Sequence, residues 1–170
     1  MARTMRAQAQ APTPDPALKK FQASVGHWAY EAEFKAGPLG PGGKFSGELT
    51  IRMILGGFFR QARSTLKGAM GEMRTLQIAW YDPANKKFAF NLYMSSGICV
   101  SGSYTFSGNT QVLFAGKFDV GGKQYQIRGT DIFAPDWMSI TMKGEMSADG
   151  NTWMPWIEGK LTKAKPAAKK

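Results

Sequence analysis

Apolar and polar residues alternate with a period of two along most of this 170-residue chain. The clearest instance is the segment 26–34, which reads Gly-His-Trp-Ala-Tyr-Glu-Ala-Glu-Phe. One of its faces carries large apolar side chains: Trp28, Tyr30, Ala32 and Phe34. The other face is small or charged: Ala29, Glu31 and Glu33. Because successive side chains of a strand point to opposite sides, this pattern predicts a strand with one buried and one wet face.

Similar segments follow, separated by turn residues such as Gly56-Gly57 and Asp82-Pro83-Ala84-Asn85. Glycine pairs and Asp-Pro sequences favour tight turns between strands. The further strands are expected at 44–54, 58–66, 73–81, 87–94, 98–106, 110–119, 123–133, 137–146 and 152–162. The Gly/Pro-rich loop at 36–43 is longer than a hairpin requires, and it is either a mobile portal loop or a wide hairpin without a function.

One short helix precedes the strands. Asp15 supplies a capping side chain and Pro16 stands in the first turn, which is typical of a helix start. Leu18, Phe21 and Val25 then recur at helical spacing. We predict a helix at 16–24 whose apolar side closes one end of the fold.

Consecutive strands joined by tight turns, with no crossover helix, predict an antiparallel meander. Closing the meander into a barrel removes the exposed edges. A two-sheet sandwich is the competing architecture, but it usually needs longer Greek-key connections. We therefore expect an all-β fold, a ten-stranded antiparallel up-and-down β-barrel with a short N-terminal helix, wide enough to hold a small ligand.

The chain divides into three parts by composition. Residues 1–14 are rich in Ala, Gln and Pro and are expected to be disordered. Residues 15–162 form the single barrel domain, and residues 163–170 form a basic C-terminal tail. An Ala-Gln-Ala stretch before a Pro-rich spacer is similar to the end of a secretory signal, whose apolar region is missing. The compartment therefore stays open: cytoplasmic as the chain stands, or periplasmic or secreted if a signal lies upstream.

The formal net charge of +10 belongs mostly to the two ends of the chain. Residues 1–20 carry +3 and residues 160–170 carry +5, which leaves +2 for residues 21–159. This distribution indicates solvated tails, with at most weak, salt-dependent adhesion to polyanions, and no specific nucleic-acid site. The sequence contains no run of eighteen apolar residues, so no membrane span is predicted. Cys99 lies in an apolar run and is expected to be a buried, inert thiol.

Several short segments resemble a known family. Gly26-His27-Trp28 resembles the Gly-x-Trp signature of the lipocalin and fatty-acid-binding superfamily. Further segments resemble a bacterial family of uncharacterised, lipocalin-like barrel proteins: Ile54 to Phe59, Trp80-Tyr81-Asp82-Pro83 with Lys87-Phe88, and Gly97 to Gly102 with Tyr104. The chain departs from that family at Trp80, where the family commonly has Gly, and at Leu92 and Met94, where it often has Trp and Asp. The resemblance implies a barrel but no established activity.

No catalytic residue, metal site or cofactor is assigned. Metal sites need clustered His, Cys or carboxylate ligands, and the chain has one His and one Cys. Related nitrobindin-type barrels hold haem through a histidine late in the chain, whereas His27 stands at the beginning, where an exposed or rim position is expected. Catalysis by a Ser-His-Asp triad would depend on His27 alone, and no Gly-x-Ser-x-Gly sequence is present.

Two charged residues stand on otherwise apolar faces. Asp131 shares a face with Tyr125, Ile127 and Phe133, and Arg63 shares one with Phe59. A charge that faces a barrel interior is costly unless it is paired, so such groups usually bind each other, water or a ligand. We predict Arg63 and Asp131 as polar groups inside the cavity. The opposite register of the third strand is the alternative, and it would leave Arg63 in solvent with Arg60 inside or at an end.

The favoured function is a binding protein that holds a small, mostly apolar molecule in its barrel. The expected ligand-binding residues are Tyr30, Phe34, Arg63, Trp80, Phe90, Tyr125 and Asp131. Trp28 is assigned to stability, because it is expected to close one end of the barrel beneath the helix. The alternatives are an isomerase or hydrolase acting through Tyr, Asp131 or His27, and a partner-binding protein acting through the basic tails. The ligand and the oligomeric state are not specified by the sequence.

Overall fold

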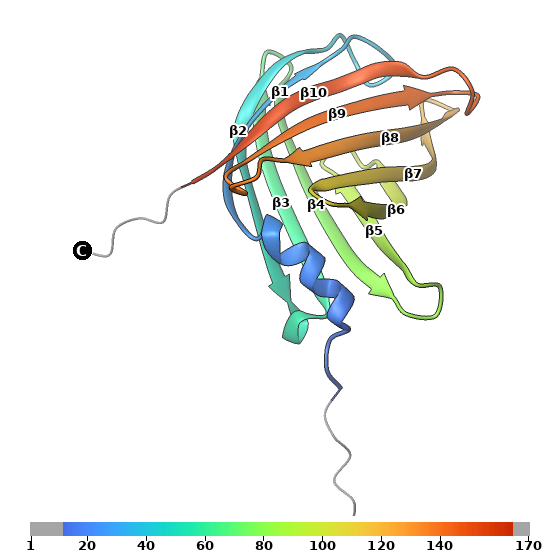
Figure 1. The fold of residues 1–170 in the computed structure, drawn as a ribbon. Coiled ribbons are helices and arrows are strands. Elements are labelled where there is room, and N and C mark those ends of the chain that lie inside the picture. Colours follow the sequence, from blue (N-terminus) through green and yellow to red (C-terminus); the bar gives the residue numbers. More distant parts are fainter. Residues whose placement is uncertain (1–11, 165–170) are drawn as a thin grey trace, which may run out of the picture.

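Ten antiparallel strands close into a single barrel in the structure, a computed structural model that describes residues 12–164. Going round the barrel, the strand order is β1-β10-β9-β8-β7-β6-β5-β4-β3-β2 (Figure 1). The bounds are β1 Gly26–Phe34, β2 Gly43–Ile54, β3 Phe59–Gly68, β4 Gly71–Asp82, β5 Lys87–Met94, β6 Cys99–Ser107, β7 Thr110–Val120, β8 Lys123–Phe133, β9 Ser139–Ser147 and β10 Met154–Lys163. The predicted all-β barrel with one short N-terminal helix is confirmed.

The first strand closes the barrel because it pairs with both its sequence neighbour and the last strand. Trp28 lies opposite Leu49 of β2 on one side and opposite Lys163 of β10 on the other. All remaining pairs join strands that are consecutive in the chain. Every strand therefore has two partners, and the barrel exposes no unpaired edge.

The turns between strands follow the predicted chemistry, with two shifts near the end of the chain. Gly56 and Gly57 have positive φ values of 68° and 92° in the short helix η2 (Leu55–Gly57), as the glycine pair predicts. β9 begins two residues later than expected, because Trp137 has a φ of 59° and its N–H bonds back to the Ala134 carbonyl. β10 also begins two residues later than expected. The Asp149 carboxylate accepts hydrogen bonds from backbone N–H groups up to that of Thr152, which keeps this segment in a turn.

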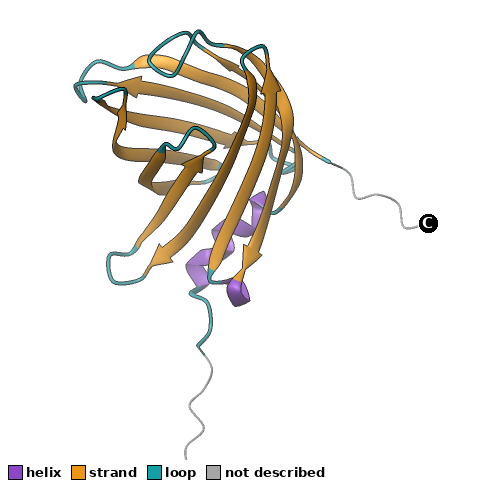
Figure 2. Ribbon diagram, turned by 180° about the vertical axis from the view of Figure 1, so that it is seen from behind, coloured by secondary structure: helices purple, strands orange, loops and turns teal. Residues whose placement is uncertain are grey.

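The N-terminal helix η1 (Pro16–Ser24) lies across one end of the barrel, as Figure 2 shows from behind. The Asp15 carboxylate accepts a hydrogen bond from the Ala17 N–H at 2.8 Å and caps the first turn. The helix is of the 3-10 type, with three residues per turn. Leu18, Phe21 and Ser24 are spaced by three and all are buried, so this period places them on one face.

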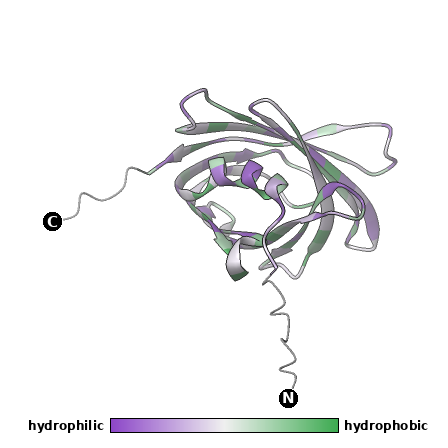
Figure 3. Cartoon of the chain, turned by 60° about the horizontal axis from the view of Figure 1, so that its bottom comes forward, coloured by the Kyte–Doolittle hydropathy of each residue, from purple (hydrophilic) through white to green (hydrophobic). Residues whose placement is uncertain are grey.

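Viewed from the lower end of the barrel, η1 lies within the ring of strands (Figure 3). The Phe21 ring packs edge to face against Phe88 and Phe106, with centroid distances of 5.2 and 5.9 Å. Trp28 is 1% exposed, and its indole N–H donates to the Ser24 carbonyl at 2.9 Å. Trp28 therefore lies beneath the helix and closes this end of the barrel, as expected.

The loop 35–42 joins β1 to β2 at the end of the barrel away from η1. Most of the predicted disordered segment 1–14, and residues 165–170 of the basic tail, lie outside the described residues. Lys163, assigned to that tail, still belongs to β10. Over residues 12–164, no helix is long and apolar enough to cross a membrane.

Candidate ligand-binding cavity

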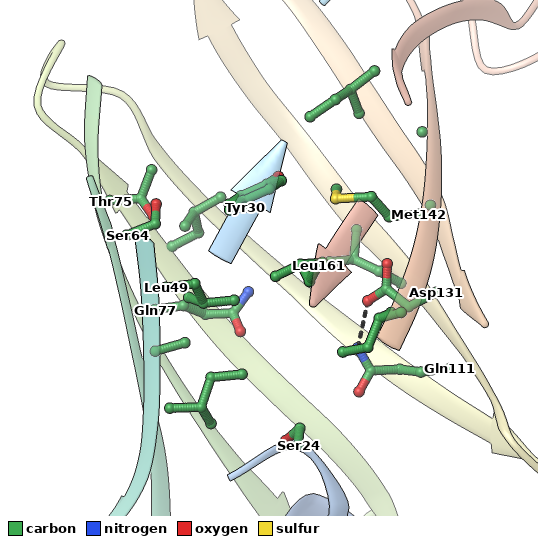
Figure 4. Close-up of a pocket in the computed structure, with 18 of the residues that line it drawn as sticks. Ser24, Tyr30, Leu49, Ser64, Thr75, Gln77, Gln111, Asp131, Met142 and Leu161 are labelled. Carbon is green, nitrogen blue, oxygen red and sulfur yellow. Dashed lines mark hydrogen bonds between the residues drawn. The ribbon is translucent and has the colours of Figure 1, made fainter. Parts of the chain in front are cut away.

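The barrel interior contains a cavity of about 220 Å³. Most of its wall is apolar, and several apolar side chains come from the inward faces of β2, β3, β5, β7, β9 and β10. These include Leu49, Leu66, Leu92, Leu113, Met142 and Leu161. Ser24 of η1 also lines the cavity, so the helix contributes to its lower boundary. Figure 4 shows several of these side chains with the polar groups that face them.

Arg60 of β3 is the centre of a polar cluster in the cavity wall. Its side chain is only 4% exposed. Its Nη2 donates to Gln77 Oε1 at 2.7 Å and to the Tyr104 hydroxyl at 3.0 Å. Its Nη1 makes longer contacts of 3.5 Å with Ser24 Oγ and Gln111 Oε1. The guanidinium thus connects β3 to β4, β6, β7 and the helix.

Aromatic rings cover the Arg60 guanidinium. Its central carbon lies 4.5 Å from the Phe21 ring centroid and 5.1 Å from that of Tyr104. A cation over an aromatic face is attracted by the ring quadrupole, and the attraction is larger when both groups are desolvated. No carboxylate among residues 12–164 makes a salt bridge with Arg60. The guanidinium is therefore stabilised by neutral acceptors and aromatic faces.

Asp131 of β8 supplies the negative charge of the cavity. Its Oδ2 accepts a hydrogen bond from Gln111 Nε2 at 3.0 Å, drawn as the dashed line in Figure 4. Burial raises the pKa of the Asp131 carboxyl to about 6, while the Arg60 charge and the Gln111 hydrogen bond oppose the rise. Gln111 therefore bridges the two charges, accepting from Arg60 and donating to Asp131.

Two tyrosine hydroxyls remain protonated in this environment. Burial raises the pKa of Tyr104 to about 12, although Arg60 and the bond to Gln77 act in the opposite direction. Burial also raises the pKa of Tyr30 well above its ordinary value, and the Asp131 charge adds to this effect. Both hydroxyls are therefore neutral hydrogen-bonding groups at physiological pH.

A family model described as "Protein of unknown function (DUF1579)" matches residues 13–163. The chain belongs to the DUF1579 family. This confirms the predicted membership of an uncharacterised barrel family, and it adds no activity. No curated protein matches the chain.

Two solved structures are similar to this DUF1579 member. The crystal structure of Rv2717c from M. tuberculosis is 17% identical, with a TM-score of 0.65 over 89% of this chain and 99% of that one. A de novo designed fluorescence-activating β-barrel is 11% identical, with a TM-score of 0.40 over 84% of this chain and 95% of that one. The first supports the barrel fold alone, and the second supports no argument about this protein.

Three of the predicted site residues line the cavity of this DUF1579 barrel: Tyr30, Phe34 and Asp131. Phe90 and Tyr125 are buried, but they belong to the packed apolar cluster and do not line the cavity. The prediction that Trp80 lines the cavity is wrong. Ala79 is fully buried and Gln77 lines the cavity, so the inward face of β4 is the opposite one.

The prediction that Arg63 lies inside the cavity with Asp131 is wrong for Arg63, which is exposed on the outer face of β3. The alternative register is correct, and Arg60 faces the interior. Gln77, Tyr104 and Gln111 accept from the two Nη atoms of the buried Arg60, whereas its Nε has no partner among the described residues. Three small or apolar residues on the Arg60 face of the strand indicate this register: Ala62, Ser64 and Leu66.

Sequence reasoning did not identify Gln77 and Gln111 as site residues, because a single glutamine in an alternating strand is indistinguishable from a surface residue. His27 is exposed, bonded to Thr50 Oγ1 at 3.0 Å, and does not line the cavity. The prediction that Cys99 is buried is wrong: Cys99 is exposed, and the adjacent Val100 occupies the inward position. Residues 12–164 bring no three His, Cys, Asp or Glu side chains together in a potential metal site.

Proposed function

We propose that this protein binds a small, mostly apolar molecule inside its barrel. The observation that supports this is the interior cavity of about 220 Å³, whose wall is apolar except for the cluster around Arg60 and Asp131. Ligand pockets typically combine an apolar lining with a few placed polar groups. The volume lies below the roughly 300–1,000 Å³ of pockets for drug-sized molecules, so the expected ligand is smaller than those.

Trp156 provides a direct test of the proposal. It lines the cavity, so a molecule that enters should change its fluorescence. We expect titration with a panel of small apolar molecules to quench the protein fluorescence in a saturable manner. The Trp156→Phe variant should lose most of this signal while still binding the same molecules in a calorimetric titration.

A matched pair of variants separates the cavity from the outer wall. Ala62 lines the cavity, and Ala29 is exposed on β1. Ala62→Leu should weaken binding because the added carbons occupy the cavity, whereas Ala29→Leu should leave binding unchanged. Equal effects of the two substitutions, or no saturable binding by any molecule of the panel, would contradict the proposal.

A second candidate function is catalysis in the same cavity, as an isomerase or hydrolase. The specific observation in its favour is Asp131, a carboxyl in a largely apolar cavity with a pKa of about 6. A group that titrates near neutral pH can both take and return a proton. A metabolite screen would show turnover by the wild type and its loss in Asp131→Asn. Absence of turnover, with ligand binding intact, would leave binding as the function.

A further inference from the structure

Two polar atoms of the Arg60 cluster face the cavity without a protein partner, in addition to Arg60 Nε, which is buried without one among the described residues. Gln77 Oε1 accepts from Arg60 Nη2 and from the Tyr104 hydroxyl, at 2.7 and 2.6 Å. Its Nε2 makes no hydrogen bond within residues 12–164, and in Figure 4 this nitrogen points into the cavity. Asp131 uses only Oδ2, in its bond to Gln111, so Oδ1 is left as a free acceptor in the described part of the chain.

Arg60 determines which way the two glutamine amides face. A guanidinium only donates hydrogen bonds, so both amides turn their oxygen toward it and their nitrogen away. The nitrogen of Gln111 is then used by Asp131, and the nitrogen of Gln77 is directed at the cavity. The cavity therefore presents a donor on the β4 wall and an acceptor on the β8 wall. These walls face each other across the barrel (Figure 4).

The charges that face the cavity balance each other. Arg60 is positive and Asp131 is negative once ionised, and Gln111 connects them. Lys143 borders the cavity, but its side chain is exposed and lies on the opposite face of β9 from Met142. A charged ligand would add an uncompensated charge to a buried apolar space, which is costly. The rings of Phe21 and Tyr104 also restrict access of an anion to the guanidinium.

We infer that the cavity selects a neutral, mostly apolar molecule whose polar group can donate a hydrogen bond to Asp131 or accept one from Gln77, as a hydroxyl can at either wall. Arg60 is the positioning residue of this site, because it orients both amides while the Phe21 and Tyr104 rings cover its guanidinium. This inference rests on the proposed function and narrows it from apolar molecules in general to neutral hydroxyl-bearing ones. Fatty-acid anions and amines are excluded by charge, and ethers lack the donor.

A ligand series of matched length tests the inference on the wild-type protein. The probes are octan-1-ol, octanoate, octylammonium and 1-methoxyheptane, titrated by calorimetry at pH 8, where Asp131 is ionised. We expect octan-1-ol to bind tightest. The ether should bind roughly fivefold more weakly for one lost hydrogen bond. Both ions should bind at least roughly tenfold more weakly because they unbalance the cavity.

Two nearly isosteric variants should reverse the charge preference in opposite directions. Asp131→Asn leaves Arg60 uncompensated, so octanoate should gain at least roughly tenfold in affinity relative to octan-1-ol. Gln77→Glu adds a negative charge, so octylammonium should gain instead. Glu48→Gln, on the exposed outer face of β2, is the control and should change neither ratio. Circular dichroism checks the fold of each variant, and the wild-type series decides the question if one does not fold.

The outcomes separate this inference from the proposed function. If no member of the series binds, and the wider apolar panel does not bind either, both fail. If octanoate or octylammonium binds the wild type tightest, the proposed function stands and the inference is overturned. If the ether binds as tightly as the alcohol, binding depends on apolar shape alone and not on the hydroxyl group. The inference is then also overturned.

Discussion

The guanidinium of Arg60 lies 4.5 Å from the ring centroid of Phe21, so a charged strand residue and an apolar helix residue meet inside the barrel. This contact joins the helix that closes one end to the polar cluster in the cavity wall. Phe21 is 1% exposed and Arg60 is 4% exposed, so neither is solvated from outside. The helix is therefore part of the site as well as a cap on the barrel.

Phe21→Ala should destabilise the protein by about 3–5 kcal/mol, the usual cost of removing a buried phenylalanine. The substitution leaves a cavity between η1 and β5 and uncovers one face of the Arg60 guanidinium. Urea unfolding followed by circular dichroism measures the change. Gln22→Ala, at an exposed position of the same helix, is the control and should change the free energy of unfolding by no more than about 0.5 kcal/mol.

Arg60→Met should also cost about 3–5 kcal/mol, because removing one member of a buried charged cluster leaves the rest uncompensated. Gln77, Tyr104 and Asp131 would lose the cation that satisfies or balances them. The same substitution at Arg63, exposed on the outer face of the same strand, should be nearly neutral. A larger loss in Arg63→Met than in Arg60→Met would contradict the observed register of β3.

Asp131→Asn should stabilise the protein at neutral pH. Asp131 has a pKa of about 6 in the folded protein against 3.8 ordinarily, so its ionised form opposes folding. The folded state holds the proton more tightly, so the wild type loses stability relative to Asp131→Asn as pH rises from about 4 to about 6. Above pH 6 the difference should level off at up to about 3 kcal/mol, which corresponds to a pKa shift of about two.

Urea unfolding of both proteins between pH 4 and pH 8 measures this difference. Tyr30 and Tyr104, which lie near Asp131, do not titrate in that window, because burial raises the pKa of both. Glu48→Gln removes one exposed carboxylate and should show no comparable pH dependence. A difference that is constant with pH, or that grows as pH falls, would show that Asp131 does not titrate as described.

Cys99 should react with a thiol reagent in the native protein, because its side chain is exposed at the start of β6. The chain has one cysteine, so a disulfide-exchange reagent such as 5,5′-dithiobis(2-nitrobenzoate) should release one equivalent of chromophore without denaturant. Release only after addition of denaturant would place the thiol in the interior. The measurement therefore distinguishes the observed position from the one that its apolar neighbours predict.

The number and order of the strands follow from local patterns. Alternation identifies each strand, and glycine pairs or Asp-containing turns separate them, so the barrel is predictable without knowledge of any distant contact. The helix is predictable for the same reason, since Asp15 and Pro16 mark its start and Phe21 marks its buried side. Tyr30, Phe34 and Asp131 are predictable as cavity residues because their strands alternate cleanly.

The polar cluster around Arg60, unlike the strands and the helix, is not specified by the local sequence. Both faces of segment 58–66 mix apolar and polar side chains, so its register depends on what lies across the barrel. Arg60 faces inward because Gln77 of β4, Tyr104 of β6 and Gln111 of β7 accept from its two Nη atoms there. In β4, likewise, the large apolar Trp80 faces outward and Gln77 faces inward.

The sequence by itself thus determined the architecture of this protein: ten strands, one capping helix and an interior wide enough for a ligand. The tertiary structure decided the chemistry of that interior. Alternation depends on neighbours in the chain, whereas the free energy of burying Arg60 and Asp131 depends on partners from several other strands. Only closure of the barrel brings those partners together, so the polar cluster and its orientation appear at that level alone.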